Sequence, residues 1–294
     1  MTVCPICTAG EASKDRTLYD DRFAHPGAWT LLACAACGHR WLDLHLGPEA
    51  IAQLYADHYP RTAGAPAPPH RASAAAWVPP EVRVLDIGCG TGDALVHHRA
   101  RGCTVRGVEA DVHAVELARA RGLAIDHGAF DPAAHVPESY DVVTLDQVVE
   151  HFTDPVTALR GIHTVLRPGG TVILATPNAA SAVARVAGDR WIHWHAPYHL
   201  HFFTRASLAH AAERAGLAVV DVRTITQPDW LSYQWIHALT RPRPGARSRL
   251  WDPAARDPRI RALRALRFLG GERLVSHLLD RLGRGDNFVA RLRK

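Results

Sequence analysis

Several features are missing from this sequence of 294 residues, and their absence narrows the class of protein. No apolar run is long enough to cross a bilayer, which excludes a helical membrane protein. The N-terminus shows no basic region followed by an apolar stretch, so we expect no signal peptide and a cytoplasmic location. No internal repeat is visible. The apolar fraction of 47% and the charged fraction of 21% are ordinary for a globular chain with a full core.

Charge of one sign is concentrated at the C-terminal end. Residues 241–294 hold 15 Lys and Arg against 5 Asp and Glu, a net charge of +10, whereas the other 240 residues hold 19 and 24, a net charge of −5. Such a segment can serve nucleic acid, an anionic substrate or an acidic partner. We favour the simpler interpretation of a solvated, arginine-rich helical face, because charge of one sign does not specify a ligand.

Four of the six cysteines form two closely spaced pairs. They are Cys4 and Cys7, then Cys34 and Cys37, with 26 residues between the pairs. This spacing predicts a tetrahedral zinc site within a zinc ribbon over residues 1–45, and Gly38 frees the backbone to complete the second turn. Two disulfides of a secreted protein are the alternative, which the missing signal peptide disfavours.

The zinc is expected to be structural, because four thiolates fill its coordination shell and leave no open position for chemistry. His39 follows the second pair and could replace one thiolate. Cys89 and Cys103 have no partner in the sequence and are expected to be small buried residues.

Beyond the ribbon, residues 46–80 are expected to hold a short helix near 51–55 and an Ala/Pro-rich linker. Strand and helix patterns then alternate through a domain over 81–294. Strands are expected at 82–87, 104–109, 124–127, 141–145, 171–175, 218–224 and 287–292, with helices at 93–100, 114–120, 155–166 and 207–215. This order predicts an α/β fold with a Rossmann-like, doubly wound, mostly parallel sheet of seven strands.

A largely helical insertion is expected at about 226–284, before the last strand. Within it, Leu274, Val275, Leu278, Leu279 and Leu282 fall on one helical face, and Gly283 can cap that helix.

The turn after the first strand of this domain carries the main chemical signal. It reads Asp86-Ile87-Gly88-Cys89-Gly90-Thr91-Gly92-Asp93. Ligands bind at the carboxyl ends of the strands in open α/β sheets, and glycines let the backbone approach them closely. A dinucleotide site would need a small residue where Asp93 stands, and this acid would repel a pyrophosphate. A cationic ligand with an ammonium and a sulfonium suits Asp86 better.

Further candidates follow the next strands in order. Glu109 ends the second strand, where a carboxylate can bind both hydroxyls of a ribose. Gly128-Ala129-Phe130 follows the third strand and could clamp an adenine, although Phe130 alone is more often a core residue. The segment Asp146 to His151 follows the fourth strand.

Together these motifs resemble the class I S-adenosylmethionine (SAM)-dependent methyltransferases, in a bacterial branch with an N-terminal zinc ribbon. The resemblance rests on Leu85–Gly92, Val149-Glu150-His151-x-x-Asp154-Pro155, Leu166–Gly170, Thr176-Pro177-Asn178 and His199–Thr204. It also includes Leu54–Tyr59 but not residues 227–284. It implies a SAM site formed by Tyr59, Asp86, Gly88, Gly90, Glu109, Ala129, Phe130, Asp146, Gln147 and His151.

The resemblance implies an enzyme that methylates oxygen or carbon of a small molecule, such as a sugar or natural product. In-line displacement from a sulfonium is mainly a positioning task, but the acceptor's proton needs a base. We favour His199 as that base, then His151, then His195. The loop Trp191–His201 is the expected acceptor site, and its tryptophans could wall an apolar substrate or line the core.

Three alternatives stay open. A metal could bind His193, His195, His199 and His201, although no carboxylate completes that set. The basic C-terminal segment could bind RNA or protein as the methyl acceptor. We favour a small-molecule acceptor over nucleic acid. Finally, the chain could bind SAM without transferring a methyl group.

Overall fold

The structure is a computed structural model that describes residues 3–9, 11–44, 47, 54, 69–252, 256–265 and 271–294. The chain divides into two units. The sheet unit comprises Arg61–Thr176, Leu208–Arg223 and Phe288–Lys294, and the ribbon unit comprises Met1–Pro60, Pro177–Ser207 and Thr224–Asn287. Tyr59, the helix expected near 51–55 and most of the expected linker lie outside the described residues, apart from Leu54 and residues 69–80.

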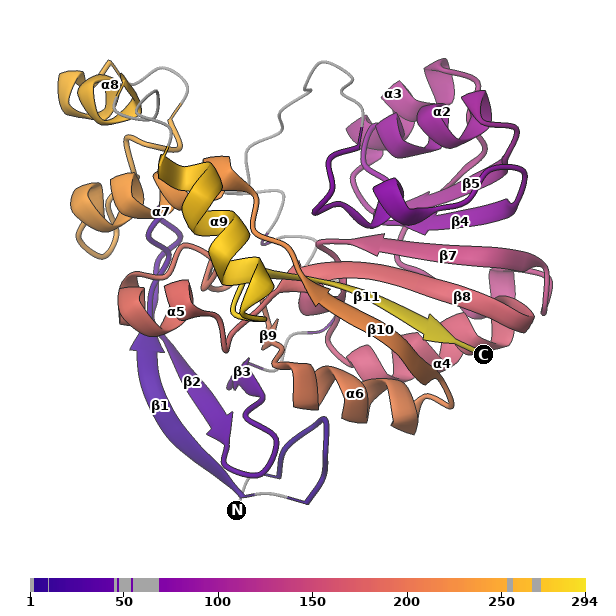
Figure 1. The fold of residues 1–294 in the computed structure, drawn as a ribbon, viewed down its shortest axis with the longest axis horizontal. Helices are drawn as coiled ribbons and strands as arrows, with labels where there is room; N and C mark the ends of the chain where they lie inside the picture. Colours follow the sequence, from indigo (N-terminus) through magenta and orange to yellow (C-terminus); the bar gives the residue numbers. More distant parts are fainter. Residues whose placement is uncertain are drawn as a thin grey trace. The chain divides into compact units, whose positions relative to one another are not determined.

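The sheet unit contains one seven-stranded sheet in the order β10-β11-β8-β7-β4-β5-β6 (Figure 1). Its strands are β4 (Arg83–Ile87), β5 (Thr104–Glu109), β6 (Ile125–His127), β7 (Tyr140–Asp146), β8 (Leu166–Pro177), β10 (Ala218–Thr224) and β11 (Asn287–Arg293). The ladders from β8 through β7, β4 and β5 to β6 are parallel. Strand β11 runs antiparallel to β8. Its C-terminal end lies at the start of β8, where the Lys294 N–H donates to the Gly170 carbonyl. The predicted fold class is confirmed.

The sheet is built from strands that are buried on both faces. Val84, Leu85 and Ile87 of β4 are at most 3% exposed, and the central residues of β7 and β8 are equally apolar and buried. Continuous apolar runs of this kind are typical of parallel strands covered by helices. Strand β8 begins earlier than the expected strand at 171–175, because it includes residues 166–170, and its pairing with β7 has a register shift at that point.

The four helices of this unit are α2 (Asp93–Ala100), α3 (Val112–Ala120), α4 (Pro155–Val165) and α6 (Arg205–Arg214). Two of them, α3 and α4, begin at an aspartate that caps the first turn. Asp154 caps α4 by accepting a hydrogen bond from the Thr157 N–H at 3.0 Å, and Pro155 occupies the first helical position.

Strand β4 lies where the strand order reverses. The chain passes from β4 to β5 and β6 on one side, then crosses to β7 on the other. In open α/β sheets ligands bind outside the carboxyl ends of the strands at such a reversal, which here is between β4 and β7.

The ribbon unit contains a four-stranded antiparallel sheet in the order β1-β2-β3-β9. Its strands are β1 (Ala12–Leu18), β2 (Trp29–Cys34), β3 (Arg40–Leu42) and β9 (His201–Phe202). Strand β9 comes from a segment about 160 residues downstream of β3. It therefore joins the His-rich loop to the ribbon, which the local pattern did not predict.

The helices of the ribbon unit in the described part of the expected insertion are α7 (Pro228–Thr240), α8 (Pro258–Ala265) and α9 (Gly271–Arg281), while α5 (Ala182–Ala187) precedes the His-rich loop (Figure 1). The core of the unit joins ribbon residues such as Leu31 to Trp191, Trp194 and Leu231. Among the described residues, no helix is both long and apolar enough to cross a bilayer.

Candidate cofactor site

The glycine-rich loop after β4 folds back onto the end of β5. The N–H groups of Gly88 and Cys89 both donate to the Val108 carbonyl, at 2.8 and 3.2 Å. Gly88, Gly90 and Gly92 have φ angles of 73°, 53° and 81°, which residues with a side chain rarely adopt. The loop therefore needs its glycines for conformation as well as for space.

The three glycines face different surroundings. A Cβ added at Gly88 would lie 2.5 Å from Val148, and one added at Gly92 would lie 2.3 Å from Leu123, so both glycines pack closely against protein. A Cβ at Gly90 would meet nothing within 4 Å. Gly90 is therefore the point at which the backbone of the loop is open to a ligand.

Glu109 is held at the carboxyl end of β5 by backbone groups. Its Oε2 accepts a hydrogen bond from Gly90 N–H at 2.8 Å, and its Oε1 accepts one from Asp111 N–H at 2.9 Å. These bonds fix the carboxylate beside the open side of the loop.

Asp86 lies beneath the loop, near the end of β4, and is 4% exposed. Its Oδ1 accepts a hydrogen bond from the Thr144 hydroxyl at 2.6 Å. Burial, together with the nearby carboxylates of Asp146 and Glu109, raises the pKa of Asp86 to about 7, against the lowering effect of the Thr144 hydrogen bond. A cation bound here would reverse this shift.

Two further acids lie at the end of β7. Burial raises the pKa of Asp146, although the Ser73 hydroxyl donates a hydrogen bond to it. Burial also raises the pKa of Glu150 to about 8, and Glu150 accepts a hydrogen bond from the Thr176 hydroxyl at 2.9 Å. Its other oxygen, Oε1, is buried with no hydrogen-bond partner among the described residues. Neither Ser73 nor Thr176 was predicted to support these acids.

The remaining predicted residues of this unit also follow the strands that were expected to carry them. Ala129 is exposed after β6, and the backbone of Gln147, with φ 57°, turns after β7. His151 is half-buried at the end of a short turn, Val149–His151. Phe130 is half-buried, and a Cβ added at Gly161 of α4 would lie 3.3 Å from its ring. Phe130 therefore packs toward a helix on one side.

Asp93 has a partner that the sequence did not indicate. Its carboxylate forms an ion pair with Arg121, which also donates to the Thr91 carbonyl at 3.0 Å. The acid at the start of α2 thus anchors the loop to the end of α3.

Within the ribbon unit, the four predicted cysteine ligands gather at one point. The sulfur atoms of Cys4 and Cys37 are 3.7 Å apart, and those of Cys7 and Cys34 are 3.6 Å apart. All four lie within 4.8 Å of one another. Four sulfurs at about 2.3 Å from a zinc ion have tetrahedral edges of about 3.8 Å, so the donor set and its spacing fit zinc.

Both cysteine pairs are held by the same kind of turn. Thr8 N–H donates to the Cys4 carbonyl at 3.1 Å, and Gly38 N–H donates to the Cys34 carbonyl at 2.9 Å. Gly38 has the expected left-handed φ of 70°. Burial opposes ionisation of Cys7, but the Ala9 N–H and the neighbouring thiols lower its pKa to about 7. Burial raises the pKa of Cys4 and Cys37, so among these three thiols the lowered pKa is confined to Cys7.

The His-rich loop is also within the ribbon unit, and its tryptophans line the core. Trp191 is 0% exposed and Trp194 is 4% exposed. The sequence left open whether these tryptophans wall a substrate or line the core, and both line the core. His195, with φ 38°, packs its ring against Phe23 and Tyr198.

The ring of His199 is oriented by a hydrogen bond to a backbone carbonyl. Its Nδ1–H donates to the His193 carbonyl at 2.9 Å, which leaves Nε2 with the lone pair of the neutral ring. That tautomer suits an acceptor of protons at Nε2.

The other histidines of the loop have different partners. His201 Nδ1 lies 3.0 Å from His39 Nε2, and burial lowers the pKa of His39 well below its usual value. His193 Nε2 lies 3.2 Å from Asp286. Because these rings serve separate partners, the structure does not support a metal site of His193, His195, His199 and His201.

Two contacts of this region were missed in the sequence. Asp286 is 2% exposed and accepts hydrogen bonds from the Ser181 hydroxyl at 2.7 Å and from Trp191 Nε1–H at 2.9 Å, besides contacting His193. Thr204 donates through its hydroxyl to the Cys37 carbonyl at 2.8 Å. No local signal points to either contact, because the partners are separated by about 100 residues or more.

Taken together, the sheet unit offers a glycine loop, a carboxylate at the end of β5 and three acids with raised pKa values near the ends of β4 and β7. Acids that are forced toward neutrality by burial regain their charge when a cation approaches. The donor set therefore fits the cationic sulfonium and ammonium of SAM and disfavours a pyrophosphate.

Comparison with known proteins agrees with this geometry. The profile of the methyltransferase domain family matches residues 50–222. The ubiquinone biosynthesis O-methyltransferase of Aeromonas salmonicida is 34% identical over 155 residues, which cover 48% of this chain and 64% of that enzyme. The enzyme of the same name from Burkholderia thailandensis is 32% identical over 164 residues, which cover 50% and 69%. The match thus spans about two thirds of these relatives.

Among solved structures, an S-adenosylmethionine-dependent methyltransferase of Mesorhizobium loti has 18% identity and a TM-score of 0.48, covering 75% of this chain and 95% of that one. The family profile covers more than half of the chain, and within it lie the glycine loop, Glu109 and the acids of β7. The chain therefore belongs to the class I SAM-dependent methyltransferases.

Proposed function

We propose that this protein transfers a methyl group from SAM to an oxygen atom of a small molecule. The observation that carries the proposal is the Gly90–Glu109 hydrogen bond, which fixes a carboxylate beside an open glycine loop above the buried Asp86. The names of the similar enzymes from Aeromonas and Burkholderia support oxygen as the accepting atom. Carbon is the alternative acceptor.

SAM supplies a methyl group bonded to a positively charged sulfur. In the proposed reaction the acceptor oxygen forms a bond to that methyl carbon, the carbon–sulfur bond breaks, and its electron pair returns to sulfur. The protein's tasks are to hold the two reactants in line and to take the acceptor's proton.

We propose that His199 is the base that takes the acceptor's proton. His151 is the second candidate for this role and His195 is the third. The Nδ1–H bond of His199 to a backbone carbonyl supports this order, because it orients the ring and leaves Nε2 able to accept a proton. His195 has a ring packed between aromatic side chains, which favours a structural role.

We further propose that the four-cysteine cluster holds one structural zinc ion. Two sulfur pairs 3.6 and 3.7 Å apart and two matching turns support it. In the ribbon unit the zinc would fix the turns that carry β2 and β3, so its role would be stability rather than methyl transfer.

The acceptor is best sought without assuming its identity. The full chain is incubated with a cell extract and SAM that carries a labelled methyl group, and labelled products are identified by mass spectrometry and NMR. We expect a small molecule with a new O-methyl group. A labelled carbon, RNA or protein would overturn the oxygen assignment, and SAM binding without any labelled product would overturn the proposed activity.

The base is tested by His199→Asn once an acceptor is known. We expect kcat to fall by about 10²–10⁴ with SAM affinity unchanged. The matched control is His210→Asn, an exposed histidine of α6, which should leave kcat unchanged. An unchanged kcat in His199→Asn, with a loss in His151→Asn, would transfer the role to His151.

A further inference from the structure

Helix α9 presents its polar face inward. Ser276 is 3% exposed, and Glu272 and Asp280 lie one turn to either side of it. The Ser232 hydroxyl donates to Glu272, and the N–H and hydroxyl of Thr226 donate to Asp280 at 2.8 and 2.9 Å. Both acids of α9 are thus engaged by groups of the same unit.

Four apolar side chains of α9 and of the residue just after it are exposed, whereas Leu279 is half-buried against the core of the unit. Leu274, Val275, Leu278 and Leu282 are 75%, 48%, 55% and 60% exposed. Their spacing places them along one stripe of the helix. A surface helix normally buries its apolar stripe and exposes its polar face. In α9 most of the apolar stripe is exposed and the polar face is turned toward the protein.

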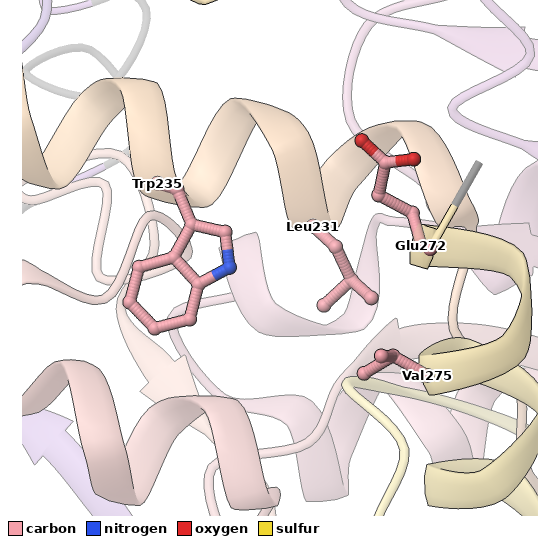
Figure 2. Close-up of a pocket in the computed structure, with 5 residues that line it drawn as sticks. Leu231, Trp235, Glu272 and Val275 are labelled. Atoms are coloured by element: carbon pink, nitrogen blue, oxygen red, sulfur yellow. The ribbon is translucent and has the colours of Figure 1, made fainter. Parts of the chain in front are cut away.

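Helix α7 extends the same apolar surface. Its Trp235 and Leu239 are 50% and 69% exposed, and α7 packs against α9. Between the two helices lies a hollow of about 270 Å³ lined by Leu231, Trp235, Gly271, Glu272 and Val275, into which side chains of both helices are turned (Figure 2). We call the six exposed residues Trp235, Leu239, Leu274, Val275, Leu278 and Leu282 the insertion patch.

The exposed charged side chains of α8 and α9 are all basic, and α7 carries one exposed acid, Asp229, in its first turn. Arg273, Arg281 and Arg284 are exposed on or directly after α9, whereas both of its acids are half-buried and accept hydrogen bonds within the unit. Helix α8 adds exposed Arg259 and Arg261. An apolar stripe flanked by arginines is typical of helices that lie in the interface of a membrane with anionic lipids.

This charge pattern distinguishes between occupants. In a symmetric contact between two copies, the same surface meets itself, so the arginines of one α9 would meet those of the other without exposed acids on that helix to balance them. An anionic surface complements them instead. The apolar stripe in turn needs a partner that buries hydrocarbon, which a nucleic acid does not provide.

We propose that the insertion patch docks on the surface of an anionic lipid bilayer. The apolar side chains enter the boundary between headgroups and acyl chains, and the flanking arginines contact the headgroups. The helix lies along the surface and does not cross the bilayer. This interaction is separate from methyl transfer, so it is measured without a methyl acceptor.

The test uses the full chain and sedimentation with vesicles of phosphatidylcholine, with or without phosphatidylglycerol. We expect binding to anionic vesicles that weakens as salt rises. The double variant Leu274→Gln/Leu278→Gln should bind at least about tenfold more weakly. Arg273→Gln/Arg281→Gln should lose roughly fivefold for each arginine at low salt.

The matched control is Val136→Gln/Val186→Gln, which changes two exposed valines elsewhere, 73% and 72% exposed, and should bind as the parent does. As a second measurement, brominated lipids should quench tryptophan fluorescence, and Trp235→Phe should remove that quenching.

Three results would overturn the proposal. They are no binding to anionic vesicles, equal binding by the Leu274/Leu278 variant, or a parent dimer that this variant converts to a monomer, which would identify a second copy as the occupant. Unchanged circular dichroism and SAM affinity in the variants show that any loss is not unfolding.

Discussion

The two units of this protein place their chemistry in opposite ways. In the sheet unit the acids that mark the cofactor site lie at or just beyond the ends of β4, β5 and β7, so short sequence motifs carry them. In the ribbon unit the decisive contacts join distant segments: His39 with His201, and Trp191 with Asp286. A parallel sheet aligns strand ends by its own geometry, whereas the contacts of the ribbon unit join residues about 100 or more positions apart in the sequence.

The largest expected effect breaks the ribbon unit alone. Cys34→Ser removes one proposed zinc ligand, and because about 10 kcal/mol of zinc-binding energy is coupled to folding in such sites, the ribbon should lose its metal and unfold. Elemental analysis should show one zinc per chain in the parent and none in the variant. Cys103→Ser, a buried cysteine outside the cluster, should keep its zinc. Full zinc content in Cys34→Ser would contradict the proposed site.

The next effect breaks the cofactor site in the sheet unit. Glu109→Ala removes the carboxylate that Gly90 holds, and Asp86→Ala removes the buried acid beneath the loop. Each should weaken SAM binding at least about 100-fold, roughly 2.7 kcal/mol, by isothermal titration. Glu116→Ala, on the exposed face of α3, should bind SAM normally. Parent-like affinity in both variants would refute the assigned site.

Measuring SAM affinity against pH tests the contribution of the charge on Asp86, apart from the shape of the site. The pKa of Asp86 is raised to about 7, so below pH 7 the free protein carries this group protonated, and a bound cation must displace the proton. SAM affinity should therefore rise with pH, by up to about tenfold per unit below 7, and level off above it. The same raised pKa makes the ligand-free protein lose stability as pH rises from about 4 to 7.

Asp86→Asn should abolish the part of this pH dependence that Asp86 causes, measured by titration calorimetry in buffers of different ionisation enthalpy. A pH profile identical to that of the parent would show that another group controls it. Glu150, with a pKa of about 8, would then be the next variant to measure.

The smallest effect compares one helix cap in each unit. Asp154→Ala removes an exposed cap of α4 and should cost about 1 kcal/mol of unfolding free energy. Ser181→Ala removes the cap of α5 and also a hydrogen bond to the buried Asp286, so it should cost about 2 kcal/mol. Denaturant unfolding measures both. Equal costs would show that the Asp286 contact adds nothing to the cap.

Much of the sheet unit could be predicted from sequence. The expected bounds of α2, β5 and β10 match the structure, and those of β4, β7 and β11 differ by one residue at one or both ends. These elements are defined by local patterns of apolar residues, glycines and caps. The supporting groups of the site were missed, because Thr144, Ser73 and Thr176 gain their meaning only from register and loop packing.

The sequence by itself determined the parallel sheet, the glycine loop and the four-cysteine cluster, because each depends on a spacing that is short along the chain or repeated. It also showed the apolar stripe of α9, but not its direction. Only the tertiary structure decided that most of this stripe is exposed, that Trp191 and Trp194 line the core, and that β9 completes the ribbon sheet. These outcomes depend on which distant surfaces compete for burial, and local spacing carries no information about that competition.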